Sequence, residues 1–109
     1  MENISENIRT QMRKGLLEYC ILRILSNNEA YASSIIEALK GAKMIVVEGT
    51  LYPLLIRLKN QQLLSYRWEE STQGPPRKYY MITDKGREQL AEMDAAWSEL
   101  VESINHLKK

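Results

Sequence analysis

Apolar residues recur at helical spacing through the first part of the chain. Within residues 11–26 they cover nearly every side of a helical cylinder, at Leu16, Leu17, Tyr19, Cys20, Ile21, Leu22, Ile24 and Leu25. A helix that is apolar almost all round must be buried from several directions. Ile8 and Met12 extend the pattern toward the N-terminus with a four-residue spacing. We therefore expect one helix over about residues 5–26, followed by a break at Asn27-Asn28.

Two shorter helices are predicted next. The first spans about residues 31–40, where apolar residues follow the i, i+3, i+4, i+7 pattern and Gly41 stands at the position of a left-handed C-terminal cap. The second spans about residues 49–61, with one apolar face formed by Leu51, Leu54, Leu55 and Leu58. Pro53 lacks an N–H group and is tolerated only in a first turn, so regular helix should begin near Thr50, itself a candidate cap.

After residue 63 the apolar period changes from 3.6 to 2, which is typical of strands. Leu64, Tyr66 and Trp68 alternate with polar residues, and a second alternating run covers residues 78–83. The Gly-Pro-Pro sequence between them, residues 74–76, cannot hold regular structure. We expect an antiparallel hairpin over about residues 63–83, with Trp68 packed against the last helix or the third one.

The last segment, residues 84–109, is predicted to be a helix with a heptad seam. Six apolar residues are spaced alternately three and four apart, at Leu90, Met93, Trp97, Leu100, Ile104 and Leu107. Thr83 or Asp84 is placed to cap the helix N-terminus. The seam needs a partner surface, which is either the first helix of the same chain or a second copy. We expect self-association.

The order helix, helix, helix, hairpin, helix predicts a mostly α fold with a small β-hairpin, in the α+β class. The two helices over residues 31–40 and 49–61 have the short connection of a helix-turn-helix, and the hairpin would be its wing. We therefore expect a winged helix-turn-helix domain over residues 1–83 and a dimerisation helix over residues 84–109.

Composition and charge fit one folded domain with a basic body. The chain has 109 residues, of which 44% are hydrophobic and 27% charged. The first 87 residues hold 13 basic and 9 acidic side chains, whereas the last 22 hold 2 and 5. Such a distribution is compatible with nucleic-acid binding by the body. With no long apolar run and no signal-like N-terminus, we expect a cytoplasmic protein that does not bind membranes.

The sequence contains no recognisable catalytic constellation. The only histidine, His106, lies near the C-terminus, and the only cysteine, Cys20, lies in an apolar helix where an inert buried thiol is expected. A single cysteine excludes an internal disulfide, and neither a phosphate-binding glycine loop nor a metal-ligand spacing is present. We expect no enzyme activity, no cofactor and no metal.

Two groups of residues could bind DNA instead. Opposite the leucine face of the third helix lie Thr50, Tyr52, Pro53, Arg57 and Asn60. Their hydroxyl, guanidinium and amide groups can bond bases or phosphates. On the hairpin, Arg67, Arg77 and Lys78 flank the stiff loop. The alternatives are an ordinary solvated helix face and an ordinary turn.

Three sequence motifs resemble the PadR-like family of transcriptional regulators. They are Glu48 to Leu58 followed by Gln62-Leu63-Leu64, then Gly74-Pro75-Pro76-Arg77-Lys78-Tyr79-Tyr80 with Ile82-Thr83 and Gly86, and finally Arg13-Lys14-Gly15-Leu16-Leu17. The resemblance implies a cytoplasmic winged-helix homodimer with a single C-terminal dimerisation helix. It also implies binding to a palindromic operator in double-stranded DNA, usually as a repressor. Ala32, where the family often has glycine, is a local departure.

The resemblance also implies roles for particular residues. Thr50, Tyr52 and Arg57 would face DNA from the recognition helix, and Arg77 and Lys78 from the wing. Phosphate contacts from the first helix are implied for Arg13 and Lys14. Some relatives bind planar aromatic compounds between two C-terminal helices, which here would place Trp97 and Met93 beside such an effector. The alternative is that Trp97 is simply a large anchor of the dimer core.

Two other functions compete with DNA binding. One is a winged-helix module that binds protein without touching DNA, and the other is a small-molecule carrier with its pocket at Trp97. Only a DNA-binding protein needs Arg57, Arg77 and Lys78 aligned on one surface, so their placement bears on the choice.

Overall fold

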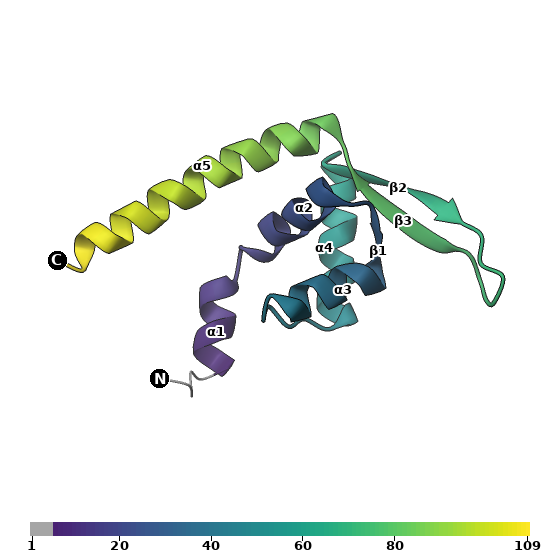
Figure 1. The fold of residues 1–109 in the computed structure, drawn as a ribbon, viewed down its shortest axis with the longest axis horizontal. Coiled ribbons are helices and arrows are strands. Elements are labelled where there is room, and N and C mark those ends of the chain that lie inside the picture. The colour runs from purple at the N-terminus through teal and green to yellow at the C-terminus, as the bar shows by residue number, and fades with distance from the viewer. Residues whose placement is uncertain (1–5) are drawn as a thin grey trace.

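A computed structural model of the protein describes residues 6–109, so the predicted helix start at Ser5 lies outside the described residues. Five helices and three strands form this described part of the chain (Figure 1). In chain order they are α1 (Glu6–Arg13), α2 (Leu17–Asn27), β1 (Ala30–Tyr31), α3 (Ala32–Gly41), α4 (Glu48–Asn60), β2 (Leu64–Glu69), β3 (Arg77–Ile82) and α5 (Asp84–Leu107). The α+β class with a helical majority is therefore confirmed.

The prediction of one continuous helix over about residues 5–26 is wrong. A turn over residues 14–16 separates α1 from α2, and Gly15 within it has a φ of 86°. This left-handed conformation is open to glycine because it has no Cβ, and it turns the chain away from the axis of α1. Ile8 and Met12 on α1 are consequently exposed rather than buried with the apolar face of α2.

The helix-turn-helix is confirmed as α3 and α4, with a different turn. Gly41 is the last residue of α3, and the left-handed residue of the connection is Lys43, with a φ of 63°. The Lys43 N–H donates to the Lys40 carbonyl oxygen over 2.9 Å, and the next N–H, of Met44, donates to the Leu39 carbonyl oxygen over 2.7 Å. These bonds satisfy the last carbonyl groups of α3.

The third predicted helix starts earlier than Pro53 suggested. α4 begins at Glu48 with Val47 as its N-cap residue, so Pro53 lies inside the helix and Thr50 does not cap it. Pro53 removes the hydrogen-bond donor for the carbonyl group four residues earlier, that of Gly49. Both residues are exposed, so water can satisfy that oxygen and the helix continues.

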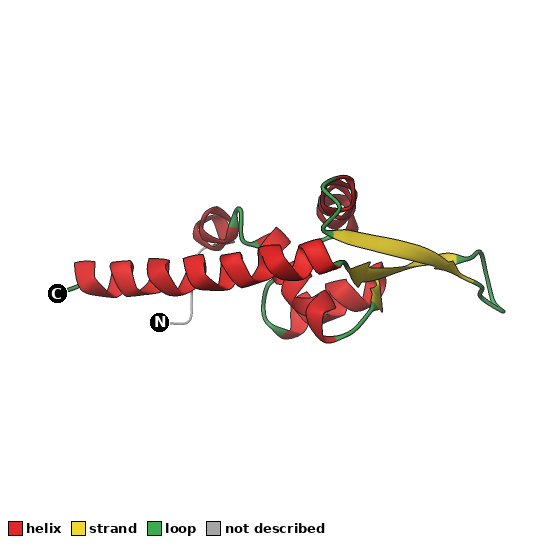
Figure 2. Ribbon diagram, turned by 90° about the horizontal axis from the view of Figure 1, so that it is seen from above, coloured by secondary structure: helices red, strands yellow, loops and turns green. Residues whose placement is uncertain are grey.

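The hairpin prediction is confirmed, and the sheet has one further strand. β2 and β3 pair antiparallel, with Trp68 opposite Lys78 and Glu69 opposite Arg77. β1 pairs with the other edge of β3, which gives the order β1-β3-β2. Figures 1 and 2 show the hairpin extending from one end of the helical body.

The hydrophobic core lies between α2, α3, α4 and the inner half of the sheet. Its fully buried side chains come from every one of these elements: Ile21, Leu22, Leu25, Ile35, Leu39, Leu51, Leu55, Leu58 and Leu64. The helical periodicities of the sequence predicted the buried positions on α3 and α4. These contacts fix the orientation of α4 and therefore of its outward face.

The start of α5 is attached to the turn between α4 and β2. The Thr83 hydroxyl caps α5 by accepting a 2.9 Å hydrogen bond from the Gly86 N–H, and it donates to the Gln62 carbonyl oxygen over 2.7 Å. One of the two predicted caps is therefore confirmed. Further along, Asp94 accepts a 2.5 Å hydrogen bond from the Tyr19 hydroxyl and forms an ion pair with Arg23. α5 is thereby fixed along α2 at its first half.

The second half of α5 extends beyond the domain (Figures 1 and 2). Its apolar residues Leu100, Ile104 and Leu107 are exposed. None of the described helices combines the length and the hydropathy that a membrane span requires.

Candidate nucleic-acid interface

The outward face of α4 consists of a central strip and two flanks. Because α-helical residues are about 100° apart, Leu51, Leu55 and Leu58 define the buried side. The strip opposite to them contains Gly49, Pro53, Ile56 and Asn60, which are all exposed. One flank carries Tyr52 and Lys59, and the other carries Thr50 and Arg57. The predicted DNA-facing residues of α4 therefore lie on opposite flanks.

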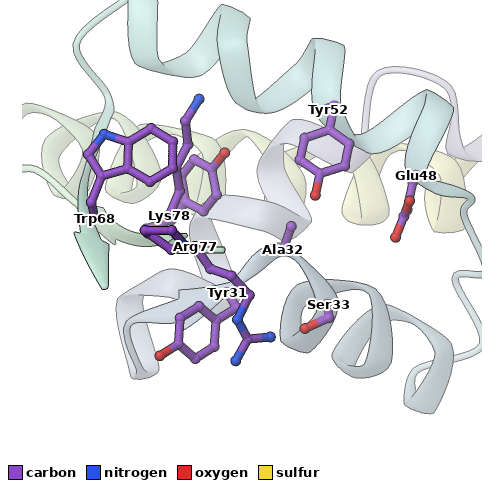
Figure 3. Close-up of a pocket in the computed structure, with 10 residues that line it drawn as sticks. Tyr31, Ala32, Ser33, Glu48, Tyr52, Trp68, Arg77 and Lys78 are labelled. Carbon is purple, nitrogen blue, oxygen red and sulfur yellow. The ribbon is translucent and has the colours of Figure 1, made fainter. Parts of the chain in front are cut away.

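A groove of about 450 Å³ runs between α4, the start of α3 and the hairpin (Figure 3). Its walls come from three parts of the chain, namely Tyr31, Ala32, Ser33, Glu48, Tyr52, Trp68, Pro76, Arg77, Lys78 and Tyr80. The structure thus brings together three predicted site residues from distant sequence positions, Tyr52 on α4 with Arg77 and Lys78 on β3. Their common position beside the recognition helix fits a wing.

The two cations of this groove are held by aromatic rings. The Arg77 guanidinium carbon lies 3.9 Å from the centroid of the Tyr31 ring. Lys78 Nζ lies 4.5 Å from the Tyr66 ring centroid and 5.5 Å from that of Trp68. Cation–π contacts restrict a cation without neutralising it. Since neither residue forms an ion pair within the described part of the chain, both charges are available to a phosphate group.

Arg67 is on the same hairpin but its charge is already neutralised. Its Nε lies 2.8 Å from Glu69 Oε2, and its Nη1 lies 3.2 Å from Glu29 Oε1. The hydrogen bonds that Arg67 donates to Glu69 and Glu29 raise the pKa of its guanidinium group above its usual value. The three cations that flank the loop in the sequence are therefore not equivalent, and Arg67 contributes little to an anion-binding surface.

Arg57 does not join the groove. Its Nε lies 3.4 Å from Oε2 of Glu18 on α2, on the flank of α4 that faces away from Tyr52. Glu18 Oε2 is buried and accepts no hydrogen bond from any described residue. Arg77 and Lys78 therefore lie on one surface, as expected, whereas Arg57 lies on a different flank of α4.

Arg13 and Lys14 lie at a distance from the hairpin. Arg13 is the last residue of α1, and Lys14 is in the turn before α2. Along the long axis of the molecule, α1 and the hairpin lie on opposite sides of α4 (Figures 1 and 2). The groove therefore contains neither of these two basic residues.

The predicted seam on α5 divides into two parts. Leu90 is 6% exposed within the core of its own domain, and Met93 packs against that core. Leu90 is consequently not free to contact a partner, which corrects its assignment to a dimer surface. Trp97 is 43% exposed, with its ring centroid 6.5 Å from that of Tyr19. From Trp97 onward, through Leu100, Ile104 and Leu107, the seam is open to solvent.

Several groove residues were not predicted as site residues. Tyr31, the last residue of β1, and Ser33, in the first turn of α3, form a wall of the groove only together with the hairpin, which comes later in the sequence. Trp68 was expected to pack against α4 or α5, but it is 62% exposed. The outer half of β2 extends past the helical body. Its apolar residues still alternate with polar ones, but none of the described helices lies there to bury them. Trp68 instead contacts Tyr66 edge-on, with ring centroids 6.0 Å apart.

The metal-ligating residue types are not clustered within the described residues. No group of three or more histidine, cysteine or acidic side chains among them is placed to hold a metal ion. Burial raises the pKa of the Cys20 thiol, which keeps it protonated near neutral pH.

Comparison with known proteins assigns the fold to a family. Residues 21–92 match the Transcriptional regulator PadR-like family. A PadR-like transcription factor from Bacteroides fragilis is 63% identical, with 94% of this chain and 99% of that chain covered and a TM-score of 0.80. A PadR-like transcriptional regulator from Bacillus cereus is 42% identical, with coverages of 91% and 97% and a TM-score of 0.79.

A third structure, a PadR family transcriptional regulator from Eggerthella lenta, is 32% identical, covers 94% of this chain and 90% of its own, and has a TM-score of 0.87. An uncharacterized protein from Lysinibacillus sphaericus is 28% identical over 101 residues, with coverages of 90% and 93%. The resemblance found in the sequence motifs is therefore confirmed over nearly the whole chain. The protein belongs to the PadR-like family of transcriptional regulators and is a DNA-binding regulator rather than an enzyme.

Proposed function

We propose that the protein is a repressor that binds a palindromic operator as a homodimer in the cytoplasm. The main support for DNA binding is the pair of unneutralised cations, Arg77 and Lys78, beside the outward face of α4. With α4 in the major groove, the hairpin would follow the adjacent phosphate backbone. Thr50, Tyr52 and Arg57 would then border the same major groove of the DNA. Arg13 and Lys14 would contact more distant phosphates.

The homodimer is supported by the unpartnered half of α5. Trp97, Leu100, Ile104 and Leu107 form one apolar stripe that the domain itself does not cover. A second copy related by a two-fold axis would present the same stripe and bury both. The two α4 helices would then meet half-sites separated by one helical turn of DNA, about 34–36 Å. A dimer placed in this way over a promoter would block transcription.

The two hairpin cations should act on phosphates. We expect Arg77→Ala and Lys78→Ala each to weaken binding to all duplex sequences by a similar factor. Each should also reduce the slope of log affinity against log salt by about one unit, because one fewer counterion is released. A fluorescence-anisotropy titration of labelled duplex at several salt concentrations measures both quantities.

Arg67→Ala is the matched control for this experiment, since Arg67 lies on the same hairpin but is paired with Glu29 and Glu69. Its salt slope should remain close to that of the unmodified protein. If the slope is unchanged for Arg77→Ala and Lys78→Ala as well, the hairpin does not contact phosphates and the proposed orientation on DNA is wrong.

We further propose that a planar aromatic compound binds between the paired α5 helices and releases the operator. The support is the position of Trp97, which is exposed on the stripe that a second copy would cover and lies close to Tyr19. Met93 lies one helical turn before Trp97 on the same side. In the alternative arrangement, the two Trp97 rings fill the dimer core and leave no space for a ligand.

Trp97 fluorescence distinguishes these arrangements. In a Trp68→Phe background, only Trp97 remains as a tryptophan emitter. We expect saturable quenching by planar aromatic compounds and a parallel loss of operator affinity. If a panel of such compounds changes neither signal, Trp97 is an anchor of the dimer core and not an effector site.

A further inference from the structure

The central strip of the recognition helix carries no charged side chain. Gly49, Pro53, Ile56 and Asn60 follow one another along the side of α4 opposite the core. Ile56 is 56% exposed, and Tyr52 beside it is 43% exposed. Ile56 is thus the large apolar side chain of the strip, with Tyr52 on the adjacent flank, while Leu51, Leu55 and Leu58 are buried on the opposite side of the helix.

The cations lie around this strip rather than in it. Lys59 is on the hairpin-side flank of α4, with its Nζ 5.9 Å from the Tyr66 ring centroid. Arg77 and Lys78 lie across the groove, and Arg57 is on the opposite flank. Cations on the borders and an uncharged centre are complementary to a DNA groove, which has phosphates along its two edges and base edges at its floor. This charge arrangement favours DNA over a protein as the occupant of the strip.

The strip lacks the usual donor for guanine. Arg57 is the only arginine of α4, and it forms an ion pair with Glu18, whose side chain is only 19% exposed. Glu18 Oε2 has no hydrogen-bond partner within the described residues, so moving Arg57 to a guanine would leave a largely buried carboxylate without its counter-charge. Arg57 is therefore suited to stay on its flank, near the phosphates.

The major groove contains one apolar base substituent, the 5-methyl group of thymine. We propose that α4 recognises its operator half-sites mainly through thymine methyl groups packed against Ile56 and its apolar neighbours, so that A·T pairs occupy the centre of each half-site. This inference rests on the proposed binding of duplex DNA. It adds the chemical class of the bases that are read and the side chain that contacts them.

Replacing thymine by deoxyuridine removes only the methyl group and tests the proposal. An operator is first selected from random duplex DNA, and each half-site thymine is then replaced singly by deoxyuridine. We expect affinity to fall about fourfold at each contacted position, the factor that corresponds to one buried methyl-sized group. Deoxyuridine at flanking positions, outside the half-sites, should leave the affinity unchanged.

Two variants assign the contact to its side chain. Ile56→Ala should bind the thymine and deoxyuridine operators with nearly equal affinity at the position that Ile56 contacts. Ile56 is exposed, so its truncation leaves the core intact. Lys59→Ala, the matched control on the adjacent flank, should weaken both operators by the same factor and keep their ratio.

The results separate this inference from the proposed function. Equal affinities of the unmodified protein for thymine and deoxyuridine operators, or selected half-sites that lack thymine, overturn methyl recognition while DNA binding stands. A deoxyuridine effect that persists in Ile56→Ala overturns the assignment to Ile56. If the selection enriches no sequence, specific DNA binding itself fails, and methyl recognition fails with it.

Discussion

Replacing Gly86 with alanine is expected to lower the free energy of unfolding by about 2–4 kcal/mol. A Cβ at this position would lie 2.0 Å from the Leu63 carbonyl oxygen and 2.7 Å from Cγ1 of Ile82. The Leu63 oxygen cannot easily retreat, because it accepts a 3.2 Å hydrogen bond from the Thr83 N–H. The first turn of α5 must therefore move away from the turn between α4 and β2.

Thermal unfolding followed by circular dichroism measures this effect, at one fixed protomer concentration because the protein is expected to dimerise. The midpoint should fall by about 10 °C or more. Gly41→Ala is the matched control, since nothing lies within 4 Å of its added Cβ at the end of α3. It should be neutral or stabilise by up to about 1 kcal/mol. A Gly86→Ala midpoint within 2 °C of the unmodified protein would contradict the close packing at this turn.

The second large effect is expected from Ile104→Glu. Ile104 is 53% exposed in the single chain and lies in the middle of the uncovered stripe of α5. A two-fold interface would contain the substitution twice, so two carboxylates would have to be desolvated close to each other. We expect the dimer to dissociate at micromolar protomer concentration.

When the dimer dissociates, operator affinity should fall by about 100-fold or more, because the two half-sites are then bound independently. Light scattering coupled to size exclusion gives the oligomeric state, and anisotropy gives the affinity. His106→Glu introduces the same side chain on the opposite side of α5 and should change neither. If Ile104→Glu stays dimeric, the stripe from Trp97 to Leu107 is not the interface between copies.

The sequence predicted those parts of the fold that depend on periodic burial. The leucines of α4 and the alternation in β2 and β3 mark faces that a single core covers, and the structure buries the inner residues of each. The predicted cap at Thr83 is also present, because capping depends on neighbouring residues only.

Features that depend on a single backbone angle or on a distant partner were missed. Periodicity shows which way a residue faces and does not show that a helix is continuous, so the turn at Gly15 was not predicted. β1 has two residues and is too short for an alternating pattern. The pairing of Arg57 with Glu18 joins α4 to α2, and no local pattern could show that it separates Arg57 from the hairpin cations.

Selection from random duplex DNA tests whether α4 and the hairpin of two copies bind an inverted repeat. We predict enrichment of an inverted repeat whose half-site centres are about 10 base pairs apart. Binding to the selected duplex should also weaken steeply with salt. Failure to enrich any sequence at low salt, or enrichment of isolated half-sites by a dimeric protein, would contradict binding of two copies to an inverted repeat.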